Sequence, residues 1–277
     1  MKKDLYTLNI GNYEPEITAI TFPLLKSYAK KIGADFKVIT ERKFPDFPIP
    51  YEKFQIYDLA KKSGAEWNLF FDADTLCYPD FFDVTTLVTK DVTIAHGSDF
   101  SIQRFKPNEY FKRDGRFQGK GNWAGIFSDL CLDYYHPLDC FTKDEAIAQI
   151  TPVVQEKNSG VSAEHLLDDF TVSLNIARYG LKHILIPELE TSRNMPHGHL
   201  YHVYSMSSEE KLIRIKKVLL GWVLTSLVGS VPTQEQLQAV TNTANAWNGT
   251  PSLKDYISVL PQGDRILEVY AAWGVPV

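Results

Sequence analysis

The first third of the chain alternates short β-like apolar segments with segments of helical periodicity. Three β-like segments have this character: LYTLNI (residues 5–10), ADFKVIT (34–40) and WNLFF (67–71). Between them, residues 21–32 and 51–63 repeat apolar side chains at the helical period, and each helix is followed by a glycine, Gly33 or Gly64. The first of these helices is expected to be capped near Thr21, with Pro23 in its first turn. Strands separated by helices of this length predict crossover connections and a parallel sheet. We therefore predict an α/β fold.

Two aspartates follow the third of these strands. Asp72 and Asp74, separated by one alanine, come directly after the apolar run. Ligands bind beyond the carboxyl ends of parallel strands, where Asn9 also falls. Carboxylate oxygens suit Mg²⁺ or Mn²⁺, which take further ligands from substrate phosphates. The segment therefore predicts a divalent-metal site for phosphate chemistry; a carboxylate that only caps the next turn is the alternative.

Composition narrows the class of protein. The chain has 277 residues, of which 44% are hydrophobic, so it can bury a sizeable core. The net charge of -5 comes from interspersed charges, which argues against a nucleic-acid partner. The three cysteines have no CxxC spacing and are expected to be reduced thiols in a cytoplasmic protein. The N-terminus lacks the apolar region of a signal peptide.

The longest apolar run, residues 218–231, is shorter than the roughly 20 residues that a membrane-spanning helix needs. We expect it to be a packed helix, with an amphipathic helix that touches a membrane surface as the alternative. Ser207 and Glu210 have the spacing of a capping box and predict the start of this long helix. The remaining tail, residues 233–277, predicts two or three further helices.

The rest of the second half is less regular. Residues 91–100 contain a short predicted strand, and residues 182–189 predict another strand. Residues 199–205 predict a short strand or turn, and polar residues 105–125 predict a long loop. Residues 162–180 predict an amphipathic helix. Two aspartates of that helix, Asp168 and Asp169, lie off its apolar stripe, so they are not expected in the core.

The segment LFFDADTL resembles the DxD motif of GT-A-fold glycosyltransferases, which use nucleotide-sugar donors. Five further segments resemble segments of family-8-like GT-A glycosyltransferases and occur in the same order along the chain. They are TLNIGNYEPEIT, YEKFQIYDLAKK, GNWAGIF, LLDDFTVSLNIARYG and HLYHVYS. The resemblance implies a GT-A-like fold, a Rossmann-type and mostly parallel sheet flanked by helices, with a helical C-terminal extension. We expect a catalytic domain over residues 1–217 and an extension over residues 218–277.

The resemblance also implies an activity. The protein would be a metal-dependent glycosyltransferase that moves a sugar from a nucleotide diphosphate sugar, with a UDP-sugar as the expected donor, to a hydroxyl group of a carbohydrate or another acceptor. Mn²⁺ or Mg²⁺ would be the cofactor. Such a reaction would serve surface polysaccharide or glycoconjugate synthesis, with at most peripheral contact with a membrane.

Metal ligands are implied in the same way. Asp72 would contact the ribose or the metal, and Asp74 would bind the metal. A histidine would complete the set, and His197, His199 and His202 are candidates. Alternation along a strand places His199 and His202 on opposite faces, and the spacing to the following helix favours His202.

Donor-binding residues follow from the resemblance as well. Thr7, Asn9 and Tyr13 would line the nucleoside pocket, with Tyr13 able to stack on the base. Lys53 would face the donor, because a phosphate would offset the cost of a cation near the start of a helix. A loop or packing role for the first three residues, and a solvated surface position for Lys53, are the alternatives.

Sugar-binding and catalytic residues complete the implied site. The sugar site would include Asn122, Trp123 and Gly125, although Trp123 could equally be a buried core residue. Asp168 or Asp169 would act as general base or face the reacting carbon, and a favourable position in the first turn of a helix is the alternative explanation. The usual glycine–lysine phosphate segment of the family is not evident; Ser205 and Lys211 stand in its place.

Other classes of protein fit less well. A haloacid-dehalogenase-like Mg²⁺-dependent phosphatase would use Asp72 as its nucleophile, but that motif should follow the first strand of its domain, and here two strand–helix units precede it. A sugar-nucleotide pyrophosphorylase would need a glycine-rich N-terminal loop, which a single Gly11 does not provide. A non-catalytic carbohydrate-binding module would show no metal-dependent affinity for a nucleotide.

Overall fold

The chain forms two compact units that are interleaved along the sequence. The computed structural model describes residues 1–96, 123–157, 162–195, 198–204, 206–228 and 263–275. The first unit comprises residues 1–12, 32–72 and 82–197, and the second comprises residues 13–31, 73–81 and 198–277. The domain boundary predicted after residue 217 falls inside helix α8 (Ser208–Val228) and stays a prediction.

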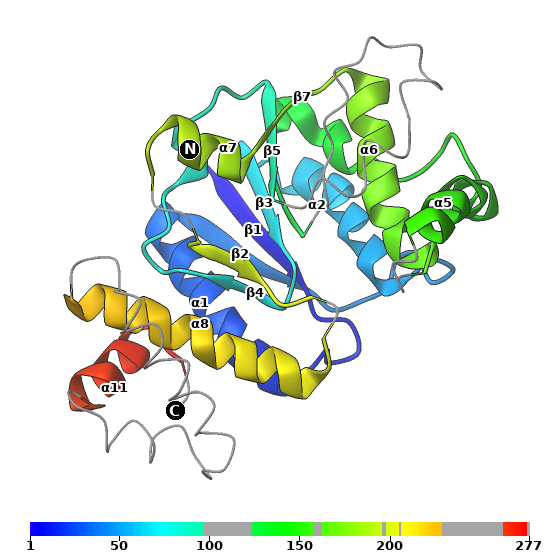
Figure 1. The fold of residues 1–277 in the computed structure, drawn as a ribbon. Helices are drawn as coiled ribbons and strands as arrows, with labels where there is room; N and C mark the ends of the chain where they lie inside the picture. The colour runs from blue at the N-terminus through cyan, green and yellow to red at the C-terminus, as the bar shows by residue number, and fades with distance from the viewer. Residues whose placement is uncertain (97–122, 158–161, 196–197, 205, 229–262, 276–277) are drawn as a thin grey trace. The chain divides into compact units, whose positions relative to one another are not determined.

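A six-stranded, mostly parallel sheet is the centre of the first unit (Figure 1). Its strand order is β2-β1-β3-β6-β5-β7. The strands are β1 (Lys3–Leu8), β2 (Ala34–Ile39), β3 (Trp67–Phe71), β5 (Val92–His96), β6 (Ala124–Ser128) and β7 (Lys182–Leu185). Only β6 among these runs antiparallel to its neighbours, β3 and β5. The predicted α/β class with a mostly parallel sheet is therefore confirmed.

Helical segments flank this sheet. They are η1 (Ile49–Gln55), α2 (Ile56–Ser63), η2 (Val84–Thr86), η3 (Asp129–Tyr135), α5 (Lys143–Lys157), η4 (Glu164–Leu166), α6 (Leu167–Tyr179) and α7 (Ile186–Ser192). Figure 1 shows α2, α5 and α6 on one side of the sheet. On this side Tyr6, Phe70 and Phe127 of the strands form one buried cluster with apolar residues of η1, α2, η3, α5 and α6. This core fixes η1 and α6 against the sheet.

Two predicted elements of the first unit differ from the structure. The helix predicted over residues 51–63 begins as the 3-10 segment η1, which follows Pro48, and becomes α-helical only at Ile56. The strand predicted over residues 182–189 ends at Leu185, and helix α7 follows directly. Pro187 explains the second difference, because proline lacks the N–H that continued pairing with a neighbouring strand would use and fits the first turn of a helix.

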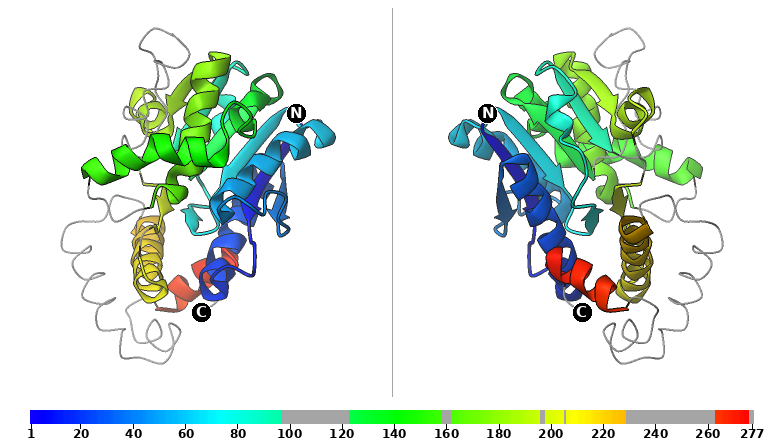
Figure 2. Two further views of the ribbon diagram at one scale, coloured as in Figure 1. Left: turned by 90° about the vertical axis from the view of Figure 1, so that its right-hand side faces the viewer. Right: turned by 90° about the vertical axis from the view of Figure 1, so that its left-hand side faces the viewer.

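The second unit contains a short antiparallel pair of strands from distant parts of the sequence and three described helices. Strand β4 (Thr75–Cys77) pairs antiparallel with β8 (Leu200–His202). The helices are α1 (Pro15–Ile32), α8 and α11 (Gly263–Ala272). Their apolar faces share a buried cluster that includes Leu24, Leu76, Leu219 and Tyr270. Helices α8 and α11 lie side by side in both views of Figure 2.

Helix α1 starts earlier than the sequence predicts. It begins at Pro15 rather than near Thr21, so Pro23 lies inside the helix and not in its first turn. The Thr21 hydroxyl donates to the carbonyl of Ala73 at 2.5 Å instead of capping the helix. Proline is well tolerated at the first helical position, and Pro15 supplies the start that the sequence analysis assigned to Pro23.

The predicted capping box of α8 is present. The hydroxyl of Ser207 accepts from the backbone N–H of Glu210, and the Glu210 carboxylate accepts from the backbone N–H of Ser207. Of the predicted tail helices, α11 is described, and residues 229–262 lie outside the described part of the chain. Within the described residues, no helix is both long and apolar enough to span a bilayer.

Candidate functional site

The carboxyl end of β3 carries Asp72 in the first unit. Its backbone N–H donates to the carbonyl of Trp123 at 2.9 Å, which continues the pairing of β3 with β6 by one residue. Its Oδ1 lies 3.5 Å from Nζ of Lys53. Asp72 is a quarter exposed, so this carboxylate can reach a ligand while it stays next to a buried cation.

Lys53 is buried among carboxylates. Its side chain is 1% exposed, and Nζ donates to Oδ2 of Asp168 at 2.7 Å. Burial alone would lower the pKa of Lys53, but the negative charges of Asp168 and Asp72 outweigh burial and raise the pKa above its ordinary value. The structure therefore excludes a solvated surface position for Lys53, and the amine stays charged at neutral pH.

The expectation that Asp168 stays out of the core is wrong. Asp168 is 6% exposed, while the adjacent Asp169 is partly exposed. Helix α6 is buried over nearly its whole circumference, because both polar and apolar residues from Leu167 to Ala177 lie inside the first unit. A carboxylate is tolerated there because the ammonium group of Lys53 pairs with it. Lys53, Asp72 and Asp168 thus form one connected charged group.

The carboxyl end of β1 leaves polar atoms without partners. Thr7 is fully buried, and neither its Oγ1 nor Oδ1 of Asn9 has a hydrogen-bond partner among the described residues. The backbone of Asn9 is nevertheless fixed, because its N–H donates to Ile39 at 2.8 Å. Unsatisfied buried polar atoms cost free energy and are uncommon. A polar ligand at this strand end would offset that cost.

Asp74 and His202 come together in the second unit. Asp74 directly precedes β4, and His202 ends β8; the two strands pair, with Thr75 opposite His202. Nε2 of His202 lies 3.0 Å from Oδ1 of Asp74. Burial would raise the pKa of Asp74, but the hydrogen bond with His202 and the charge of Lys211 lower it well below its usual range. Asp74 is therefore a buried carboxylate that stays ionised.

Lys211 is the second close partner of Asp74. It lies in the first turn of α8, is 6% exposed, and donates from Nζ to Oδ2 of Asp74 at 2.9 Å. The same ammonium group donates to the hydroxyl of Tyr13 at 2.5 Å and to Oε1 of Glu14 at 3.0 Å. Tyr13 also donates to Oδ2 of Asp74 at 3.1 Å. Lys211, Tyr13, Glu14 and Asp74 are called the lysine cluster below.

The other histidines have different surroundings. The ring of His199 lies against the ring of Tyr78, with centroids 4.6 Å apart, and burial lowers its pKa. Since His199 does not have Asp74 as its described partner, the structure brings His202 rather than His199 to that carboxylate. His197 and Ser205 lie outside the described residues.

The predicted sugar-binding residues are only partly described. Gly125 lies inside β6, where it pairs with Phe70 of β3 and Ala95 of β5. Trp123 precedes that strand and is half-buried, with its ring 4.2 Å from the ring of His96. Asn122 lies outside the described residues. Trp123 is therefore not a fully buried core residue, and its backbone carbonyl accepts a hydrogen bond from the backbone N–H of Asp72.

The carboxylate of Asp74 and the imidazole of His202 have the spacing of two ligands on a divalent ion. Two ligands on an octahedral ion with bonds of about 2.1 Å stand roughly 3 Å apart. The 3.0 Å between Oδ1 of Asp74 and Nε2 of His202 matches this spacing. Asp72 precedes Asp74 by two residues, so their Cα atoms can be no more than about 7 Å apart. A carboxylate suits both Mg²⁺ and Mn²⁺, whereas an imidazole suits a transition metal such as Mn²⁺ better than Mg²⁺.

The sequence analysis did not identify Glu14 as a functional residue. Its backbone φ of 33° is unusual for a residue other than glycine, and its carboxylate pairs with Lys211 across 197 residues of sequence. A run of Gly11, Asn12 and Glu14 with positive φ marks this turn, and only Gly11 signals it in the sequence. The contact with Lys211 has no local sequence signal.

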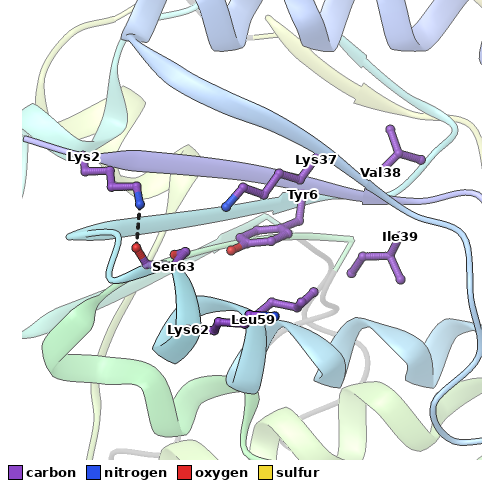
Figure 3. A pocket seen from close by; sticks show the side chains of 8 residues that line it. All are labelled: Lys2, Tyr6, Lys37, Val38, Ile39, Leu59, Lys62 and Ser63. Atoms are coloured by element: carbon purple, nitrogen blue, oxygen red, sulfur yellow. Dashed lines mark hydrogen bonds between the residues drawn. The ribbon is translucent and has the colours of Figure 1, made fainter.

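A separate cavity of about 500 Å³ lies in the first unit, over the edge of the sheet (Figure 3). Its lining includes Lys2, Lys37, Lys62, Tyr6, Leu59 and Ser63. Lys37 is neutralised by buried Asp4, to which it donates at 2.5 Å. Among the described residues, those predicted for the site do not line this cavity, so it is distinct from the groups above.

Comparison with known proteins adds limited information. No family profile matches the sequence, and no curated protein matches it. One similar solved structure is a glycosyltransferase involved in the glycosylation of the major capsid of PBCV-1, with 12% identity, a TM-score of 0.42, and coverage of 75% of this chain and 96% of that chain. Another is the galactosyltransferase LgtC in complex with donor and acceptor sugar analogs, with 10% identity, a TM-score of 0.41, and coverage of 76% and 94%. Both similarities are low, so a functional assignment depends on the residues of this chain.

Proposed function

We propose that this protein is a metal-dependent glycosyltransferase that moves a sugar from a nucleotide diphosphate sugar, with a UDP-sugar as donor, to a hydroxyl-bearing acceptor. The observation that carries the proposal is the contact of Asp74 with His202, 128 residues later in the chain. Asp74 is the second aspartate of the pair that follows β3. The distance between its Oδ1 and Nε2 of His202 equals the spacing of two ligands on one ion.

Asp72, Asp74 and His202 are the proposed ligands of Mn²⁺ or Mg²⁺. The ion would neutralise the negative charge that develops on the leaving nucleoside diphosphate. Asp74 is suited to this role because it stays ionised although it is buried. Asp72 is suited because its carboxylate is partly exposed.

The first unit would supply the groups that act on the sugar. In the proposed reaction, the bond between the anomeric carbon and the phosphate oxygen breaks, and its electron pair leaves with the nucleoside diphosphate. The acceptor oxygen bonds to the anomeric carbon and loses its proton. We assign the proton to Asp169, the more exposed of the two carboxylates on α6. Asp168, fixed by Lys53, would be a negative charge that faces the developing positive charge on the sugar.

The remaining predicted residues would hold the donor. Thr7 and Asn9 offer buried polar atoms that lack protein partners among the described residues. Tyr13, Asn122, Trp123 and Gly125 retain the nucleoside and sugar roles that the resemblance implies. All three cysteines are free, as expected of a cytoplasmic protein, and that location remains a prediction.

A panel of nucleotide sugars tests the proposal. Release of UDP or another nucleoside diphosphate would be measured with and without Mn²⁺, with water as the default acceptor and simple sugars as added acceptors. We expect metal-dependent release with one donor and a loss of at least about 100-fold for Asp74→Asn. Asp80→Asn is the matched control, because Asp80 lies on the same unit and its side chain is 76% exposed. Unchanged metal-dependent turnover in Asp74→Asn would refute the assignment.

The same protein samples separate the phosphatase alternative. A phosphatase with Asp72 as nucleophile would hydrolyse p-nitrophenyl phosphate in the presence of Mg²⁺ and would lose that activity in Asp72→Asn. The strand before Asp72 is the third along the chain, which is the wrong position for that nucleophile. We therefore expect no phosphatase activity from the wild-type protein.

A further inference from the structure

The ammonium group of Lys211 has used all of its hydrogen-bonding capacity. A lysine ammonium has three N–H donors. In the lysine cluster these donors meet Oη of Tyr13 at 2.5 Å, Oε1 of Glu14 at 3.0 Å and Oδ2 of Asp74 at 2.9 Å. Lys211 therefore cannot contact another anion unless it releases one of these partners.

Both carboxylate oxygens of Asp74 are also engaged. Oδ1 lies 3.0 Å from His202, and Oδ2 accepts from Lys211 and from Tyr13. A divalent ion at Asp74 would therefore share its carboxylate with an ammonium group. Two positive charges on one mostly buried carboxylate repel each other more strongly than they would in water.

We propose that Lys211 is an internal cation that occupies Asp74 in the absence of donor, so that tight binding of a divalent ion depends on binding of a nucleoside diphosphate. This inference rests on the proposed function. The diphosphate supplies the competing anion: it draws the ammonium group away from Asp74 and leaves Oδ2 to the metal. Because binding equilibria are linked, the ion must also strengthen nucleotide binding by the same factor.

The position of Lys211 on α8 supports such an exchange. Lys211 lies in the first turn, and its backbone N–H donates to the carbonyl of Ser207 at 2.9 Å. A cation at a helix N-terminus is electrostatically unfavourable, and the same end of the helix favours an anion. A phosphate that approaches Lys211 would therefore meet a cation whose own position at the helix end is unfavourable.

Glu14 is the second carboxylate that pairs with the ammonium group of Lys211. Its φ of 33° is sterically unfavourable for an L-residue, and such a conformation persists only where surrounding contacts hold it. The ion pair with Lys211 is one of these contacts. The Glu14 carbonyl also accepts from the backbone N–H groups of Ile17 and Thr18, so the start of α1 fixes the residue whose carboxylate holds Lys211.

Direct measurement of Mn²⁺ binding tests the inference without an activity assay. Free Mn²⁺ would be followed by electron paramagnetic resonance, with and without saturating UDP, for the wild-type protein and for Lys211→Met, Lys211→Arg and Lys217→Met. Lys217→Met removes the same charge from the same helix and is the matched control. We expect UDP-free Mn²⁺ affinity to rise about tenfold in Lys211→Met and to stay within about twofold of wild type in the two other variants.

The outcomes separate this inference from the proposed function. If the wild-type protein binds Mn²⁺ only with UDP, and Lys211→Met binds Mn²⁺ no more tightly without UDP, the inference is wrong while the proposed function stands. If the wild-type protein binds neither UDP nor Mn²⁺, the proposed function itself fails. Thermal melting would show whether Lys211→Met folds. If it does not, Tyr13→Phe removes one hydroxyl that holds Lys211, and its UDP-free Mn²⁺ affinity should rise about threefold; an unchanged affinity would again refute the inference.

Discussion

Nζ of Lys53 lies 2.7 Å from Oδ2 of Asp168, and both side chains are more than nine-tenths buried. The contact joins η1 to α6 across 115 residues of sequence. Neither charge is isolated, because Asp72 lies beside the same ammonium group. The pair therefore fixes the distance between a strand-end carboxylate and a helical carboxylate in the first unit.

Removal of Lys53 should destabilise the protein strongly. Lys53→Met leaves the buried carboxylate of Asp168 without a counter-charge, and we expect a loss of about 3–5 kcal/mol in the free energy of unfolding. Urea denaturation would measure it. The control is Lys182→Met, which breaks the exposed ion pair with Asp91 and should leave the free energy of unfolding nearly unchanged.

The double variant Lys53→Met/Asp168→Asn should lose much less stability than the sum of the two single variants, since neither buried charge then lacks a partner. Strict additivity of the two losses would show that the pair is not energetically coupled.

His202 and His199 should differ in their effect on metal binding. In the presence of UDP, His202→Gln should weaken Mn²⁺ binding by at least about 10–100-fold. Loss of a residue that only hydrogen-bonds to a metal ligand already has an effect of that size. His199→Gln should change it by less than about twofold, because the His199 ring packs against Tyr78. Equilibrium dialysis with Mn²⁺ would measure both, and equal effects would contradict the assignment of His202.

Acid should remove the stability that Asp74 contributes. Its pKa is lower in the folded protein than in the unfolded chain, where it is about 3.9, so the unfolded state binds more protons as the pH falls. The contribution is complete above about pH 5 and is lost progressively as the pH falls toward the folded pKa. The free energy of unfolding would be measured by urea denaturation at pH 6, 4 and 3. The difference in this free energy between wild type and Asp74→Asn should become smaller as the pH falls. For Asp80→Asn the difference should stay small throughout, since Asp80 is largely exposed.

The capping box of α8 should contribute measurably to stability. Ser207→Ala removes the hydroxyl that accepts from Glu210, and we expect a cost of about 0.5–2 kcal/mol by thermal or urea unfolding. Ser192→Ala is the control, because its hydroxyl donates to a carbonyl at the end of α7 and caps no helix N-terminus. No measurable loss for Ser207→Ala would show that the cap is energetically unimportant.

Local periodicity predicted much of the fold from the sequence. Strands β1, β2 and β3 and the glycine ends of α1 and α2 follow from the spacing of apolar residues, which depends on near neighbours. The start of α1 and the change from β7 to α7 were predicted wrongly, because each depends on which proline the chain places in a first helical turn.

The candidate site was predictable only where a residue type has a narrow chemical use. The resemblance supplied the candidate histidines, and strand alternation and spacing favoured His202, which the structure places beside Asp74. The burial of Asp168 could not be predicted from its helix, because its tolerance depends on Lys53 far away in sequence. The contact of Glu14 with Lys211 likewise depends on the tertiary fold and leaves no periodic pattern.

The interleaving of the two units has a consequence for how such a gene can diversify. The chain passes from one unit to the other after residues 12, 31, 72, 81 and 197. A single recombination junction anywhere between these points exchanges part of both units at once. Neither unit can therefore be inherited from a different parent by one crossover. Asp72 and Asp74 lie on opposite sides of the transition after residue 72.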